Sequence, residues 1–174
     1  MHTCPFYPPA PSPGPSTIID YNPAEFCLQA KANGARCLVL WSGGHRVIFN
    51  RHGTELTAPK GHATVLAITS DLPVGVALDA EYIHAERQLY IFDLPLHPGI
   101  LDERLADIPA LLPRLPGATM IPMAHGDFAR HAADWRAAGA EGFILKKRSS
   151  LYRKCARPNT KVREWVKFRF SWQQ

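Results

Sequence analysis

Short stretches in which apolar and polar residues alternate predict most of the strands in this chain, because successive side chains of a strand point to opposite faces of a sheet. The stretch ARCLVLW, the turn SGGH and the stretch RVIFNR together predict a β-hairpin. Two more strands are predicted in GVALDAEYIHAERQLYIFDLPL, with a turn near Glu86. The end of YNPAEFCLQAK and the segments GATMIPMAHG, EGFILKKR and REWVKFRF are also predicted to be strands.

Three stretches between these strands are predicted to be helices. They are HATVLAITSDL, LDERLADIPALLPRL and DFARHAADWRAAGA. Pro109 and Pro113 are expected to break the second helix or to start pieces of it. The third is predicted to have its N-cap at Asp127 and to stop at Gly139. Together the elements predict an α+β fold with antiparallel sheets flanked by helices.

The chain has 174 residues, which is enough for one domain with a sizeable core. Residues 5–16, PFYPPAPSPGPS, are mostly Pro, Ser and Gly, and such a stretch cannot form a helix or a central strand. We therefore predict a proline-rich flexible leader over residues 1–17 and one domain over residues 18–174.

Charge and cysteine content narrow the class of protein further. The formal net charge of +5 suits a polyanionic partner such as nucleic acid. The four cysteines form no C-x-x-C pair, which argues against a structural zinc site and favours reduced thiols. No apolar run is long enough to span a membrane, and no secretory signal is visible. We expect a cytoplasmic protein without membrane association.

Six charged side chains lie at the ends of predicted strands or turns. A single charged residue at such a place is usually just solvated, so each has an ordinary explanation when taken alone. Their order along the chain and the segments around them are what indicate a site. The six are Lys31, Arg51, Asp79, Glu81, Glu141 and Lys167.

In this order, the segments around these residues resemble the nucleotidyltransferase motifs of ATP-dependent DNA and RNA ligases and of mRNA-capping enzymes. The resemblance extends over roughly residues 20–170 and implies the ATP-grasp-like nucleotidyltransferase (adenylation) domain of ligases. The segments that carry it are KANGAR (31–36), RHG (51–53), LDAEYI (78–83), LYIFDL (89–94), EGFILK (141–146) and WVKFR (165–169).

The resemblance implies that Lys31 attacks the α-phosphate of ATP and forms a covalent lysyl-adenylate. The amine must be neutral to attack, and desolvation, a bound metal ion and cations such as Lys146 and Lys167 would favour that form. Phe92 would stack on the adenine, although an aromatic residue of the core fits the same position. Mg²⁺ or Mn²⁺ would be held by Glu81 and Glu141. The implied nucleotide contacts are Ala30, Gly34, Arg36, Arg51, Glu81, Phe92, Glu141, Lys146, Lys167 and Arg169.

The expected partner is nucleic acid with 5′-phosphate ends or nicks. Arg36 and Arg51 would hold the adenylate phosphate and the 5′-phosphate of that substrate. A basic run near the C-terminus would contact the phosphate backbone, chiefly through Arg153, Lys154 and Arg157. The whole run consists of Arg148, Arg153, Lys154, Arg157, Lys161 and Arg163.

Three positions depart from the family pattern: Asn33 replaces the usual Asp, Ala80 a Gly, and Arg169 a Lys. The chain also ends five residues after Arg169, where relatives usually continue into an OB-fold, so a partner protein is one expected replacement for it. The sequence favours a minimal ATP-dependent polynucleotide ligase, DNA ligase-like, that seals 5′-phosphate to 3′-hydroxyl. RNA ligase, RNA guanylyltransferase, a catalytically lapsed nucleic-acid-binding module and a basic α+β domain with accidental motifs remain alternatives.

Overall fold

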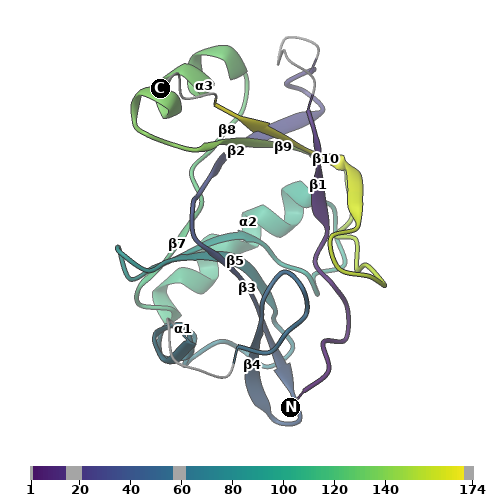
Figure 1. The fold of residues 1–174 in the computed structure, drawn as a ribbon, viewed down its shortest axis with the longest axis vertical. Helices are drawn as coiled ribbons and strands as arrows, with labels where there is room; N and C mark the ends of the chain where they lie inside the picture. The colour runs from purple at the N-terminus through teal and green to yellow at the C-terminus, as the bar shows by residue number, and fades with distance from the viewer. Residues whose placement is uncertain (1, 15–20, 57–61, 171–174) are drawn as a thin grey trace.

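Two five-stranded sheets face each other in the computed structural model, which describes residues 2–14, 21–56 and 62–170 (Figure 1). The first sheet has the order β1 (Ala10–Pro13), β10 (Lys161–Arg169), β9 (Gly142–Lys147), β2 (Phe26–Lys31), β8 (Met123–Ala124). The second has the order β4 (His45–Phe49), β3 (Ala35–Ser42), β5 (Leu78–Ile83), β6 (Gln88–Asp93), β7 (Ala118–Met120).

Helices cover the outer faces of both sheets. The helix α3 (Phe128–Ala137) packs on the first sheet, and α1 (His62–Ile68) and α2 (Leu101–Leu111) pack on the second (Figure 1). A short 3₁₀ turn, η1 (Leu112–Arg114), follows α2. This arrangement confirms the predicted α+β class, and none of the helices in the described ranges is long and apolar enough to cross a membrane.

The pairing of the strands differs from the prediction at two places. Most pairs are antiparallel, but β1 runs parallel to β10 and β6 runs parallel to β7, so both sheets are mixed. The second case has a simple cause, because α2 forms a crossover between β6 and β7 and returns the chain to the same end of the sheet. The predicted hairpin of β3 and β4 is present, and its two turn residues, Gly43 and Gly44, both have positive φ, as a two-residue turn of this kind requires.

Local signals place the helices largely as expected. Asp127 accepts a hydrogen bond from the backbone N–H of Arg130, so it caps α3, and the helix ends two residues before Gly139. Pro109 does not break α2, which continues through it to Leu111. Pro113 lies in η1, where the α-helix has already ended.

Residues 2–14 of the proline-rich N-terminal segment are extended but packed, which differs from the flexible leader that the composition predicts. Cys4 and Phe6 are buried in the core between the sheets, and β1 forms an edge strand on β10. Proline is tolerated there because an edge strand needs ladder hydrogen bonds on one side only. The predicted boundary between residues 17 and 18 lies outside the described residues. The four cysteine thiols are buried and free.

Candidate nucleotide-binding cleft

A cleft of about 630 Å³ opens between the two sheets, a size typical of small-molecule sites. Alternate residues of β9 and β10 face it, since every second side chain of a strand shares one face, and the last three residues of β2 line it as well. The site residues predicted from the sequence that line it are Ala30, Lys31, Gly34, Arg36, Arg51, Glu81, Phe92, Lys146, Lys167 and Arg169. The motifs, which are far apart in the chain, therefore converge on one cavity.

Lys31 is the last residue of β2 and lies at the mouth of this cleft. Its Nζ is 2.5 Å from Oε2 of Glu141, and the other oxygen of Glu141 is 3.2 Å from Nε of Arg169. The contact follows from the ladder, in which Lys31 pairs with Gly142 of β9, the neighbour of Glu141. The Lys31 side chain is 20% exposed, so it is held in place and still reachable by a ligand.

Cations dominate this part of the cleft. Burial lowers the pKa of Lys167, and the positive charges of Arg169, Lys161 and Lys31 lower it further, while Glu141 opposes them. Four cationic side chains with one neighbouring carboxylate form a site that attracts an anion. Phosphate groups of a nucleotide have the matching charge.

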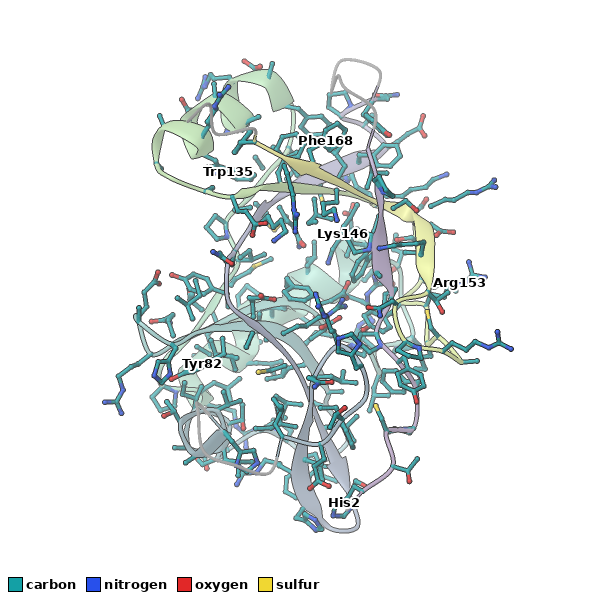
Figure 2. The ribbon with its side chains drawn as sticks, viewed as in Figure 1. His2, Tyr82, Trp135, Lys146, Arg153 and Phe168 are labelled. Carbon is teal, nitrogen blue, oxygen red and sulfur yellow. The ribbon has the colours of Figure 1, made fainter. Side chains whose placement is uncertain are left out.

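Lys146 lies at the base of the cleft, between the two sheets (Figure 2). Its Nζ donates to the backbone oxygen of Phe92 at 3.1 Å and to Asp93 at 3.3 Å, and it lies 3.8 Å from the ring centroid of Trp165. Burial lowers the pKa of Lys146, and the Asp93 carboxylate acts in the opposite direction. The protein itself therefore supplies several partners for this ammonium group.

Asp93 is also held by Arg104 of α2, whose Nε lies 2.6 Å from it, and both side chains are fully buried. The sequence reasoning missed this pair. A signal was present, because Arg104 occupies the apolar stripe of α2 formed by Leu101, Leu105 and Ile108. A charged residue in such a stripe indicates a buried partner, since an isolated buried charge is very costly.

Arg36 is held in the wall of the cleft by a second buried aspartate. It donates to Asp79 through Nε at 2.8 Å and through Nη2 at 2.5 Å, and through Nη1 to the backbone oxygen of Pro9 at 2.8 Å. Burial alone would lower the pKa of Arg36, but the Asp79 carboxylate raises it above its ordinary value. Tyr152 also donates to Asp79, at 2.6 Å. Asp79 was one of the six charged residues that indicated a site, but the sequence assigned no role to it, and Tyr152 was not predicted at all.

The Phe92 ring lines the cleft and packs against the core at the same time. It meets the Trp165 ring edge-on, with the centroids 6.5 Å apart. The guanidinium of Arg36 lies 5.3 Å from the centroid of Phe92. Both expected roles, core aromatic and nucleobase platform, are compatible with this position.

Gly34 is explained by a close approach of the protein to itself. A Cβ at this residue would lie 2.4 Å from the backbone oxygen of Tyr82. This constraint comes from the protein alone and is separate from the nucleotide contact that the family resemblance implies. The backbone N–H of Gly34 donates to Glu81 at 3.1 Å. Burial raises the pKa of Glu81, and this hydrogen bond and the charges of Arg36 and Lys31 oppose the increase.

Gly34→Ala is expected to displace the loop between Lys31 and β3 and to weaken ATP binding at least about tenfold, since the clash is with backbone rather than with a mobile side chain. The measurement is a calorimetric titration with ATP. Gly44→Ala is the control for a glycine outside the cleft, because it is strained by its positive φ in the β3–β4 hairpin but has no heavy atom within 4 Å of the added Cβ. Equal ATP affinity in Gly34→Ala and the wild type would contradict the expectation.

The basic residues predicted to contact nucleic acid differ in where they lie and in how exposed they are. Arg51 is exposed at the rim of the cleft, and its Nε donates to His52 at 3.0 Å. Arg153, Lys154 and Arg157 are exposed in the loop between β9 and β10, and Figure 2 shows Arg153 at the periphery. Arg148 is an exception within the basic run, because it pairs with Asp102 at 2.8 Å instead of lying open to a ligand.

The described residues contain no group of three His, Cys, Asp or Glu side chains that could hold a metal ion by itself. Glu81 lines the cleft, and Glu141 contacts Lys31, which lines it too. Two carboxylates together with substrate phosphates are a usual ligand set for Mg²⁺, which retains several waters. The donor set therefore fits a metal that arrives with a nucleotide.

No family model and no curated protein matches this chain. Solved structures do match it. The ligase domain of LigD from M. tuberculosis is 22% identical, with a TM-score of 0.75 over 97% of this chain and 61% of that one. A mycobacterial DNA ligase D complexed with ATP and MES is 24% identical, with a TM-score of 0.71 over 97% and 62%. A Chlorella virus DNA ligase-adenylate is 12% identical, with a TM-score of 0.67 over 94% and 67%.

These likenesses show that the chain has the fold of the nucleotidyltransferase (adenylation) domain of ATP-dependent DNA ligases, as its motifs predicted. The chain spans about three fifths of the length of the two mycobacterial ligase structures.

Proposed function

We propose that this chain is the adenylation domain of an ATP-dependent polynucleotide ligase and that Lys31 is its nucleophile. The observation that carries the proposal is the position of Lys31. It lies at the mouth of a nucleotide-sized cleft, beside Glu141 and the cations Lys167 and Arg169. The fold shared with DNA ligases, one of them complexed with ATP and another an adenylate, supports the same assignment.

In the first step the lone pair of Lys31 Nζ attacks the α-phosphorus of ATP. A P–N bond forms, the bond to the β-phosphate oxygen breaks, pyrophosphate leaves, and Nζ loses a proton. Lys167 and Arg169 offset the negative charge on the phosphates while this occurs. Mg²⁺ or Mn²⁺, held by Glu81 and Glu141, would supply further charge neutralisation. To hold that metal, Glu141 would have to give up its contact with Lys31.

Two transfers then follow. A 5′-phosphate oxygen of the polynucleotide attacks the phosphorus of the lysyl-AMP and releases Lys31. The 3′-hydroxyl of the adjoining strand next attacks the activated 5′-phosphorus and releases AMP. Arg51 at the rim and Arg36 in the wall are the residues we assign to the phosphate groups in these steps.

The test of the function is incubation of the full chain with Mg²⁺ and α-labelled ATP or, separately, GTP, followed by a denaturing gel. Acid-labile label from ATP supports the ligase proposal. Label from GTP would instead assign RNA guanylyl transfer. No label from either nucleotide would favour a lapsed nucleic-acid-binding module or an enzyme that needs a partner protein in place of an OB-fold.

DNA is our proposed substrate, because the similar structures that name a substrate are DNA ligases and because exposed basic residues surround the cleft. RNA ligation is the second candidate, since Asn33 stands where the lysine motif of RNA-joining relatives also carries Asn. Sealing of nicked DNA duplexes and nicked RNA duplexes by the pre-adenylated protein separates the two.

Binding to a nicked duplex is expected to weaken steeply as salt rises, because phosphate contacts release counterions. Replacing Arg153, Lys154 and Arg157 together by Ala should reduce the slope of log K against log salt by about one unit for each lost phosphate contact. Fluorescence anisotropy at several salt concentrations measures it. Arg130→Ala, at an exposed residue of α3 on the outer face of the first sheet, is the control. An unchanged slope in the triple variant would place the nucleic acid elsewhere.

A further inference from the structure

Tyr152 connects the basic loop to the wall of the cleft. It lies in the loop between β9 and β10, next to Arg153, and is only 9% exposed. Its hydroxyl donates to Oδ2 of Asp79 at 2.6 Å, and the same oxygen accepts from Nη2 of Arg36 at 2.5 Å. Burial, followed by the Asp79 carboxylate, raises the pKa of Tyr152 well above its ordinary value, so the hydroxyl keeps its proton and acts as a donor.

Asp79 in turn fixes the guanidinium of Arg36. The five N–H groups of an arginine lie in one plane. Two of them bond to Asp79 and one bonds to the backbone oxygen of Pro9, which sets the orientation of that plane. Arg36 lines the cleft, so its remaining two N–H groups are the ones left to bind a ligand there. Their direction depends on the direction of the Asp79 carboxylate.

We infer that Tyr152 is a positioning residue, which orients Arg36 toward phosphate by holding Asp79 in one rotamer. The inference rests on the proposed function. Arg36 bonds to both oxygens of Asp79, but these two contacts would follow the carboxylate if it rotated. The Tyr152 hydroxyl bonds to Oδ2 from another part of the chain, so it fixes the carboxylate independently of Arg36. Donors that are oriented before the substrate arrives need no reorganisation during the reaction, so they stabilise its transition state more effectively.

Tyr152→Phe removes this hydroxyl and keeps the ring, which packs edge-on against Trp165 and Phe6. The rate of lysyl-AMP formation at saturating ATP is expected to fall about tenfold, the usual loss for a hydrogen bond to a charged group. The KM for ATP should stay within about twofold, because the loss concerns orientation rather than binding. Single-turnover labelling at a series of ATP concentrations measures both values.

Two control variants separate positioning from general destabilisation. Tyr90→Phe also removes a hydroxyl that donates to a carboxylate, that of Glu86 at 2.6 Å, but this exposed bond joins β6 to the turn before it. Val65→Ala removes buried volume from α1 on the outer face of the second sheet. If either variant lowers the rate as much as Tyr152→Phe at a matched thermal midpoint, the inference is overturned. A rate for Tyr152→Phe within twofold of the wild type overturns it as well.

A readout without catalysis keeps this test independent of the proposed function. The Nε–H of Arg36 is bound to Asp79, so its ¹⁵N NMR signal should be protected from exchange with water. The signal is assigned by its absence in Arg36→Lys. In Tyr152→Phe the exchange should become at least about tenfold faster. An unchanged exchange rate of the Arg36 Nε–H in Tyr152→Phe overturns the inference, even if the wild type forms no lysyl-AMP. If the wild type is not labelled by ATP but the exchange is faster in Tyr152→Phe, only the proposed ligase function is contradicted.

Discussion

Lys31→Arg is expected to lower covalent labelling by ATP at least about a thousandfold, which is the effect of losing a nucleophile that forms a covalent intermediate. Arginine keeps the positive charge beside Glu141, so the electrostatic surroundings of the cleft change little. A guanidinium is always protonated in proteins, however, and has no lone pair with which to attack phosphorus. The variant therefore separates the charge of Lys31 from its chemistry.

The measurement is the amount of acid-labile label on a denaturing gel, together with calorimetric binding of ATP. The label should disappear while ATP binding stays within about tenfold of the wild type, because the remaining contacts of the cleft are intact. Lys147→Arg, at the exposed end of β9, is the matched control and should keep full labelling. Labelling of Lys31→Arg at the wild-type level would place the nucleophile at another residue.

Arg104→Met is expected to lower the free energy of unfolding by about 3 kcal/mol, because it leaves the fully buried Asp93 carboxylate without its main partner. The two backbone oxygens that Arg104 also serves, those of Gly99 and Ser150, lose a donor at the same time. Lys146 still contacts Asp93 at 3.3 Å, so the loss falls at the lower end of the range for broken buried pairs.

Urea unfolding of the two proteins measures this difference. Arg148→Met is the matched control, since it breaks the half-exposed pair with Asp102 and should change stability far less. In a double-mutant cycle, Asp93→Asn combined with Arg104→Met should cost less than the sum of the single changes, because each single variant leaves a partner unpaired. Equal losses of unfolding free energy in Arg104→Met and Arg148→Met would show that the buried pair contributes no more to stability than the partly exposed one.

The sequence predicted the residues that face the cleft better than the residues behind them. Lys31, Glu141 and Lys167 sit at or near the ends of strands with clear alternation, so their order along the chain was enough to bring them together. Asp93 lies at the end of an equally clear strand, but its partner Arg104 comes from a helix whose packing angle no local pattern specifies. The same is true of Tyr152, which reaches Asp79 from an irregular loop.

Two other differences have physical causes of the same kind. Arg148 belongs to a run of basic residues that was expected to contact nucleic acid. It forms an ion pair with Asp102 at 2.8 Å instead, and only the fold brings these two residues together. The proline content of residues 5–16 excluded a helix and a central strand, and over residues 5–14 the structure agrees, since β1 is an edge strand. It could not reveal that β10 leaves an edge open for β1, because that depends on residues at the other end of the sequence.

The parallel pairing of β1 with β10 also bears on how the protein is made. Ser12 donates to the backbone oxygen of Val162, and the two residues are 150 positions apart in the sequence. A ribosome adds roughly 5–20 residues per second, so the N-terminal segment waits on the order of ten seconds for its partner strand to be synthesised. During that interval Cys4 and Phe6 lack part of the core that later covers them. The wall of the cleft that contains Pro8 and Pro11 is therefore completed only after translation of β10.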